Sequence, residues 1–290
     1  MKNIALILLL ISVLLINIPV TAHSQDNKKK SITWLIWELS PEYIRTGPMK
    51  GRGFADQYLD YFIKHLPDFN HNITWTSIPR FHREALLAGR CTPHIWGHFY
   101  PNQFAYSKPY TLTPPHVAIF HKSYEKRLGP PGTILSFVDL LGREKFTLMT
   151  PKHYEDQRRY PILHPYILPY IGSKQIKQMP HSANEVDLRL IARGRADFSL
   201  GYPTTIGAQK IDRGIKGDFI AYDLKEHQTY NNIHVGCFGD AQGREVIAKI
   251  DKMFNPAMLE SFLKLYEKWN ARHPKFRKTF YDKIVSQFEE

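Results

Sequence analysis

Residues 31–37 read Ser-Ile-Thr-Trp-Leu-Ile-Trp, and residues 54–66 read Phe-Ala-Asp-Gln-Tyr-Leu-Asp-Tyr-Phe-Ile-Lys-His-Leu. The first stretch is rich in β-branched and aromatic residues, which predicts a buried strand. The second stretch repeats apolar residues at near-helical spacing, which predicts an amphipathic helix that ends at Pro67. A strand followed by a helix that covers it indicates an α/β fold.

The same alternation continues along the chain. We expect further strands at 73–78, 91–99, 117–120, 146–149, 197–200 and 233–237. We expect helices at 81–88, at 134–141, from Thr150-Pro151 onward, from a capping box at 182–185 through Val186 to Gly194, at 245–254 and at 257–269, with a short last one. Residues 86–100 and 190–202 both follow the order helix, Gly-Arg turn, strand, aromatic residue. The pattern predicts two similar α/β lobes, each a mostly parallel sheet flanked by helices.

The N-terminus has the features of an export signal. Lys2 precedes an apolar run at 4–16, in which Ser12 is the one polar residue, and the small residues Val20 and Ala22 stand at the minus-three and minus-one positions of a cleavage site. The run is short for a membrane anchor, which needs roughly 20 apolar residues. We therefore expect a signal peptide at 1–22, a polar leader at 23–30 and a periplasmic protein.

The chain is strongly basic. Its formal net charge is +12, and loss of Lys2 with the signal peptide leaves 12 − 1 = +11. Such a charge suits an anionic ligand, an anionic membrane surface or nucleic acid. No nucleic-acid-binding module is recognisable, so nucleic acid is not an expected partner.

Cys91 and Cys237 are the only cysteines. An oxidising compartment permits a disulfide between them. The sequence leaves the question open, because it cannot show whether their Cα atoms come within about 7 Å.

Several short motifs occur in a characteristic order. They are Ser40-Pro-Glu-Tyr43, Gly51-Arg-Gly-Phe-Ala-Asp56, Leu86 to Arg90, Phe104-Ala-Tyr-Ser-Lys-Pro-Tyr110, Asp139-Leu-Leu-Gly142, Gly194-Arg-Ala-Asp197 and Tyr266 to Trp269. In this order they resemble the family-3 extracellular solute-binding proteins, whose fold is the type II periplasmic-binding-protein fold. The resemblance runs from about residue 32 to residue 269.

The resemblance implies two lobes around a cleft, joined by two crossover segments. It places lobe 1 at 31–114, lobe 2 at 115–222, and the return crossover with C-terminal helices on lobe 1 at 223–290. It also implies capture of a small polar or aromatic solute by hinge closure, for an inner-membrane permease of the ABC type. Two alternatives stay open, a sensory subunit that docks onto a membrane-bound receptor and a periplasmic enzyme on the same fold.

Ligands of such sheets gather beyond the carboxyl ends of strands. The candidate ligand-binding residues there are Trp37, Tyr43, Trp96, Tyr100, Gln103, Thr150 and Tyr202. The aromatic side chains could stack on a ring or a cation, or belong to the core. Thr150 could bind an anion at a helix N-terminus or act only as a cap.

Gln103 marks a departure from the family. It stands where amino-acid-binding members carry an arginine for the ligand carboxylate, and the acidic residue that they use for the ligand amine is not found around Gly201-Tyr202. A standard α-amino acid is therefore not the expected ligand.

Metal binding and catalysis have little support. Cys91, His94 and His98 have spacing that resembles a metal site, but on a strand the cysteine points away from both histidines. The sequence also lacks a Gly-x-Ser-x-Gly elbow, a His-Glu-x-x-His motif and a Walker motif. We expect no metal, no cofactor and no enzymatic activity.

Overall fold

The computed structural model describes residues 29–97, 99–151, 160–179, 185–269 and 274–289. The expected signal peptide and most of the polar leader lie outside these ranges. Ser31–Glu290 form one compact unit. Within the described ranges, no helix combines the length and the apolar character needed to cross a membrane.

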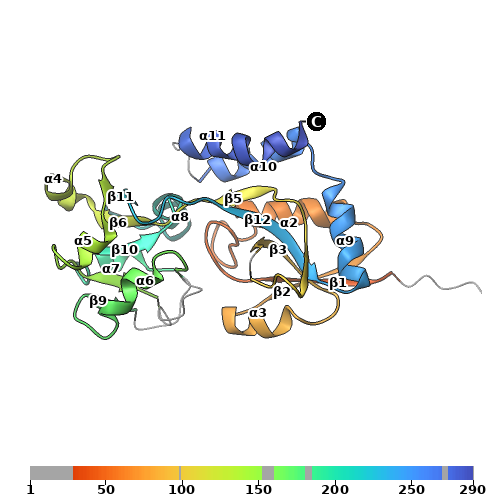
Figure 1. Ribbon diagram of the computed structural model, residues 1–290, viewed down its shortest axis with the longest axis horizontal. Helices are drawn as coiled ribbons and strands as arrows, with labels where there is room; N and C mark the ends of the chain where they lie inside the picture. Colours follow the sequence, from red (N-terminus) through yellow and green to blue (C-terminus); the bar gives the residue numbers. More distant parts are fainter. Residues whose placement is uncertain (1–28, 98, 152–159, 180–184, 270–273, 290) are drawn as a thin grey trace, which may run out of the picture. The chain divides into compact units, whose positions relative to one another are not determined.

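The first sheet has the strand order β2-β1-β3-β12-β4, with β5 paired to β12. Its strands are β1 (Ser31–Ile36), β2 (Asn70–Trp75), β3 (Arg90–Trp96), β4 (Phe104–Tyr106), β5 (Thr111–Thr113) and β12 (Asn231–Phe238). β1 runs parallel to β2 and β3, whereas β12 runs antiparallel to β3, β4 and β5. Figure 1 shows the blue strand β12 among strands from the first half of the chain.

The second sheet has the order β7-β11-β6-β10-β8-β9. Its strands are β6 (Val117–His121), β7 (Ile134–Leu135), β8 (Leu148–Thr150), β9 (Ile176–Gln178), β10 (Phe198–Gly201) and β11 (Phe219–Leu224). β6 is antiparallel to both neighbours, and the remaining pairs are parallel. The α/β fold of two sheets is confirmed. Each sheet is mixed because the strand that enters it from the other sheet, β6 or β12, runs against its neighbours.

Helices pack on both sheets. Those with side chains in the core of the first sheet are α2 (Phe54–Lys64), α8 (Thr205–Arg213), α9 (Ala241–Asp251), α10 (Pro256–Glu267) and α11 (Pro274–Lys283), followed by η3 (Val285–Phe288). The others are α3 (Ile78–Glu84), η1 (Lys122–Tyr124), α4 (Glu125–Leu128), α5 (Phe137–Leu141), α6 (His164–Ile167), η2 (Leu168–Tyr170) and α7 (Leu188–Ala192). The predicted amphipathic helix after Gly53 is α2, with Tyr58 and Phe62 fully buried.

Three predicted helices begin elsewhere, because other residues cap them. α3 begins at Ile78, since the Ser77 hydroxyl accepts a hydrogen bond from the Arg80 N–H at 3.4 Å. The helix expected over 134–141 is divided into β7 and α5 by the N-cap Ser136. The helix expected through Val186 begins only at Leu188, because Asp187 is its N-cap. Residues 182–184 of the expected capping box, and the helix expected after Thr150-Pro151, fall outside the described residues.

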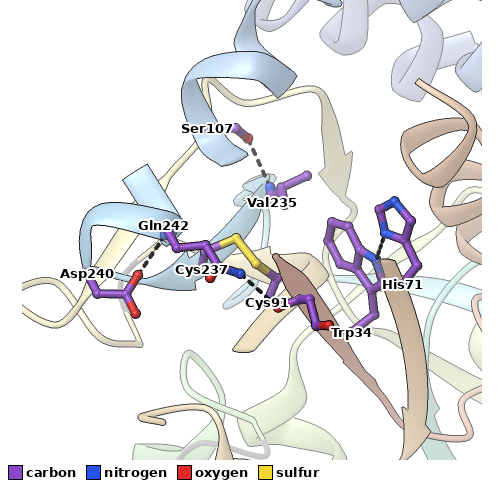
Figure 2. Close-up of a disulfide and its surroundings, with 10 residues drawn as sticks. Trp34, His71, Cys91, Ser107, Val235, Cys237, Asp240 and Gln242 are labelled. Carbon is purple, nitrogen blue, oxygen red and sulfur yellow. Dashed lines mark hydrogen bonds between the residues drawn. A yellow bond between two sulfur atoms is a disulfide. The ribbon is translucent and has the colours of Figure 1, made fainter. Parts of the chain in front are cut away.

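Cys91 and Cys237 form a disulfide, which answers the question that the sequence left open (Figure 2). The two residues are direct partners in the β3–β12 ladder, and their Cα atoms are 4.0 Å apart. Both side chains are buried. The bond spans 146 positions of the sequence, so all strands of the second sheet lie inside the loop that it closes.

Candidate functional site

The segment after β1 folds into a tight turn. The Leu39 N–H donates to the Tyr43 carbonyl at 3.1 Å, and the Tyr43 N–H donates to the Leu39 carbonyl at 2.9 Å. Ser40, Pro41 and Glu42 form the tip of this turn. All three line a large cavity, and Glu42 is only partly exposed.

The first turn of α2 holds the tip in place. The N–H groups at the start of a helix have no partner within it. Here the Phe54 N–H donates to the Pro41 carbonyl at 3.0 Å, and the Ala55 N–H donates to the Glu42 carbonyl at 3.1 Å. The backbone of Glu42 is therefore fixed by the helix, which sets where its carboxyl group lies.

The Asp56 carboxylate ties the rest of the loop to α2. It accepts hydrogen bonds from the N–H groups of Ile44 and Gly53, both at 3.0 Å. Burial raises the pKa of Asp56 to about 6, although these two hydrogen bonds act in the opposite direction. Asp56 thus has a structural role in the Gly-Arg-Gly-Phe-Ala-Asp motif.

The cavity has a volume of about 1260 Å³ and receives side chains from segments of both sheets. Aromatic side chains form much of its lining, and they are Trp37, Trp75, Phe81, Trp96, Phe99, Tyr160 and Tyr202. Thr113, at the end of β5, accepts a hydrogen bond from the Trp96 indole N–H at 3.0 Å. A cavity of this size exceeds the roughly 300–1,000 Å³ of typical ligand pockets. It can hold a small organic solute together with water.

Most charges of the cavity lining are paired. Arg80 contacts Glu84 at 2.5 Å, Arg189 contacts Asp187 at 2.5 Å, and Arg213 contacts Glu185 at 3.1 Å, measured between nitrogen and oxygen atoms. Arg45 is exposed, with its guanidinium 5.9 Å from the centre of the Trp75 ring.

The Glu42 carboxyl group differs from the other charges of the lining. Within the part of the chain that the structure describes, it has no hydrogen bond and no ion pair. Burial and, second, the negative charge of Glu185 raise the pKa of Glu42 to about 8. Residues whose pKa values are shifted this strongly are found more often at functional sites than elsewhere.

The two connections between the sheets contact each other beside the cavity. His116 precedes β6 and lines the cavity, and its backbone N–H donates to Nδ1 of His227 at 3.1 Å. The ring of Tyr202 stacks on that of His116, with centroids 4.6 Å apart. Since Nδ1 of His227 accepts, the proton of the neutral ring lies on Nε2.

We expect His227 to make the protein sensitive to acid. Burial lowers the pKa of His227 to about 4 from 6.5, so the unfolded state binds the additional proton between these values and folding stability falls as the pH drops. His227→Gln keeps an acceptor for the His116 N–H but cannot be protonated. Between pH 7 and pH 5, urea unfolding of the wild type should lose about 2 kcal/mol more than that of the variant. Equal losses would show that His227 does not titrate in this range.

No protein-family model matches the sequence, and no curated protein sequence matches it. Solved structures do. A probable amino-acid ABC transporter extracellular-binding protein, ytmK from Bacillus subtilis, aligns with a TM-score of 0.57 at 12% identity over 83% of this chain and 98% of its own. The sensor domain of a histidine kinase with similarity to periplasmic binding proteins aligns with a TM-score of 0.56 at 15% identity, over 84% of this chain and 97% of its own.

The periplasmic domain of BvgS from B. pertussis aligns with a TM-score of 0.57 at 11% identity over 89% of this chain. This chain spans 46% of the length of that domain. Identities this low establish the fold alone, and the sheet orders described above agree with it. The chain has the type II periplasmic-binding-protein fold. The resemblance found in the sequence is thus confirmed at the level of the fold.

Three of the predicted site residues, Trp37, Trp96 and Tyr202, line the cavity. Trp37 packs against Phe81 with ring centroids 4.8 Å apart, and Trp96 stacks on Phe99 at 5.5 Å. These contacts fix the orientation of both indole rings. Whether they contact a ligand stays a prediction.

The other four predicted residues lie outside the cavity lining. Tyr43 is fully buried in the core of the first sheet, because the turn points Glu42 into the cavity instead. Thr150 ends β8 and is fully buried, with its hydroxyl 3.4 Å from the Lys177 carbonyl. The Tyr100 hydroxyl contacts His82.

Gln103 lies at the surface beside β4. Its side chain is exposed, and its carbonyl accepts a hydrogen bond from the Gly239 N–H at 2.7 Å. The residue that replaces the family's arginine is therefore away from the cavity, so its identity says little about the ligand.

The suspected metal motif is divided by the fold. Cys91 is bonded to Cys237, and His98 lies outside the described residues. The Tyr110 hydroxyl donates to the Pro93 carbonyl at 2.6 Å, so it accepts from Nδ1 of His94 at 3.0 Å. Among the described residues, no group of three or more His, Cys, Asp and Glu side chains is arranged to hold a metal ion.

Sequence reasoning missed Ser40, Glu42 and His116 as cavity residues. Ser40 and Glu42 belong to the Ser40-Pro-Glu-Tyr43 motif, and that motif was the available signal. Which of its side chains faces the cavity depends on the Leu39–Tyr43 backbone pairing. Nothing in the local sequence of His116 marks it as a cavity residue.

Proposed function

We propose that this protein is a periplasmic solute-binding protein, which captures a small polar or aromatic solute in the cavity and passes it to the permease of an ABC-type transporter. The observation that supports this most is the cavity itself, because residues of both sheets line it and two chain connections join the sheets beside it. In this proposal residues 31–114 and 223–290 form lobe 1, and residues 115–222 form lobe 2.

Hinge closure follows from that arrangement. A solute that contacts both lobes makes its full set of contacts only when they close, so binding shifts the population toward the closed form. Export by a signal peptide at 1–22 is part of the same proposal. The disulfide supports it, since such bonds persist in oxidising compartments.

A sensory role is the second candidate. The similarity to a histidine kinase sensor domain favours it, and the closed form would then dock onto a membrane-bound receptor. The neighbouring genes distinguish the two roles. A permease and an ATPase encoded beside this gene support transport, whereas a histidine kinase supports sensing.

A thermal-shift screen tests the proposed function. The protein is expressed from its full-length coding sequence in an exporting host and mixed with amines, amino acids, organic acids, aromatic acids, sugars and short peptides. A solute at 100 times its Kd stabilises the fold by about 2.7 kcal/mol. That corresponds to about 5–10 °C in Tm for a chain of this size.

The fate of the solute completes the test. Recovery of the bound solute unchanged after incubation supports a binding protein, and its conversion would indicate an enzyme on the same fold. An unchanged Tm across all of these classes would contradict capture of a small solute.

A further inference from the structure

We propose that the cavity binds an organic cation, with Glu42 as its counter-charge and the aromatic side chains as its walls. This inference rests on the proposed function and names the class of solute. It follows from the balance of charge in the cavity, from the two polar groups at the tip of the turn, and from the aromatic residues around them.

The charge balance favours a cation. Three of the four arginines in the lining, Arg80, Arg189 and Arg213, already contact carboxylates. The fourth, Arg45, is exposed, so water solvates its charge. The Glu42 carboxyl group, unlike these arginines, is neither paired nor well solvated, because it is largely buried and has no partner among the described residues. A bound cation would compensate it, whereas a bound anion would add to the repulsion.

Ser40 provides a second polar group at the same place. It is 5% exposed, its Oγ is buried, and no described residue gives that atom a hydrogen bond. A buried polar group without a partner costs about 1–3 kcal/mol. Ser40 and Glu42, two positions apart on the turn, both line the cavity, so a cation bound at the tip would lie next to two polar side chains.

The aromatic lining suits the organic part of such a cation. Trp37, Trp96 and Tyr202 are partly exposed and line the cavity, with ring orientations fixed by packing. A cation within about 6 Å of an aromatic ring gains about 0.5–2 kcal/mol, and more when it is desolvated. A carboxylate together with aromatic faces therefore favours an ammonium group over a neutral sugar.

A cation also couples binding to closure. Glu42 follows a strand of the first sheet, and Glu185 belongs to the chain between two strands of the second sheet. Both residues line the cavity, and the negative charge of Glu185 contributes to the raised pKa of Glu42. A cation bound in the cavity would therefore be attracted by a carboxylate from each side, which favours the arrangement that brings both residues to the same cavity.

Two sets of three probes, each set with the same side chain, test the class of solute. In the aromatic set phenethylamine is a cation, 3-phenylpropanoate is an anion and phenylalanine is a zwitterion. Butylamine, pentanoate and norvaline form the matching aliphatic set. In calorimetric titrations at pH 8, one amine or both should bind at least tenfold more tightly than the acid and the amino acid of the same set.

Tighter binding of an acid or of an amino acid would overturn the inference. So would the absence of binding by both amines while another solute raises the Tm, and that outcome would leave the proposed function standing.

Glu42→Gln tests the counter-charge. Glutamine has the shape of the protonated glutamic acid, so the variant should fold like the wild type, as circular dichroism and Tm will show. It should bind the preferred amine at least tenfold more weakly. The matched control is Glu289→Gln, which makes the same chemical change at an exposed residue far along the chain from the turn and should leave the affinity unchanged. Equal affinities of wild type and Glu42→Gln would overturn the assignment.

The pH profile gives a readout that a structural role of Glu42 would not produce. Phenyltrimethylammonium keeps its charge at every pH, so only the protein titrates. Because the pKa of Glu42 is about 8, the affinity of the wild type should rise about tenfold from pH 6 to pH 7 and level off above pH 8. The profile of Glu42→Gln should be flat. A flat profile of the wild type would overturn the inference, even if the variant failed to fold.

Discussion

Replacing both Cys91 and Cys237 with alanine should lower the free energy of unfolding by about 3–5 kcal/mol. The disulfide closes a loop over 146 positions of the sequence. Without it, the unfolded chain gains the conformational freedom of that loop, in which the whole second sheet lies. Denaturant unfolding of the oxidised wild type and of the double variant measures the difference, which should appear as a lower midpoint with a larger slope.

Reduction of the wild type provides the control for this prediction. Because both sulfur atoms are buried, the protein is unfolded in denaturant, reduced with dithiothreitol and refolded in its presence. The reduced wild type keeps both cysteine side chains and loses only the bond. Its free energy of unfolding should agree with that of the double alanine variant to within about 1 kcal/mol. The small cavities that the two missing sulfur atoms leave in the variant account for the difference. A reduced protein that unfolds at the same denaturant concentration as the oxidised one would contradict the chain-entropy argument.

The sequence predicted elements where one periodicity was strong. α2 was found because its apolar residues recur at helical spacing over eleven residues. α8 was missed because its sequence, Thr-Ile-Gly-Ala-Gln-Lys-Ile-Asp-Arg, contains a glycine and offers few apolar residues. Its burial comes from tertiary contacts, such as Ala208 in the core of the first sheet.

β11 shows a different limit. Its residues alternate between buried and partly exposed, which is the pattern of a strand with one covered face. The prediction missed it because it proposed no strand between residues 200 and 233 and ended lobe 2 at residue 222, inside β11. Boundaries between elements and connections depend on where the neighbouring strand ends, and β6 pairs with β11 as far as Asp223.

The candidate site was predictable at the level of strand ends but not of side chains. Trp96 and Tyr202 line the cavity because they end or follow strands that point to it. Thr150 also ends a strand, but it is fully buried and lies opposite Gln178 of the neighbouring strand β9. To tell which strand ends face the cavity and which are buried, the order of the strands in the sheet must be known. The partnership of Cys91 and Cys237 has the same cause, because it depends on the register of β3 against β12.

Gly53→Ala should lower the free energy of unfolding by about 3 kcal/mol and weaken solute binding at least tenfold. A Cβ atom at Gly53 would lie 2.1 Å from the Glu42 carbonyl oxygen and 2.7 Å from that of Pro41. Both neighbours are backbone atoms, so the turn itself must move. The movement breaks the hydrogen bonds between the tip and α2 and displaces the Glu42 carboxyl group. Thermal unfolding and titration with the solute found in the screen measure the two effects.

Gly214→Ala separates this clash from the general cost of replacing a glycine. Gly214 has a φ of +61°, and an added Cβ would meet nothing within 4 Å. Alanine in that left-handed conformation costs roughly 1–2 kcal/mol through backbone strain alone. Gly53 has a φ of −61°, which alanine adopts without strain, so its whole effect must come from contact with the turn. We expect Gly214→Ala to bind solute with unchanged affinity. If Gly53→Ala unfolds at the temperature of the wild type, the close approach of α2 to the turn does not fix Glu42, and the position of that carboxyl group must have another origin.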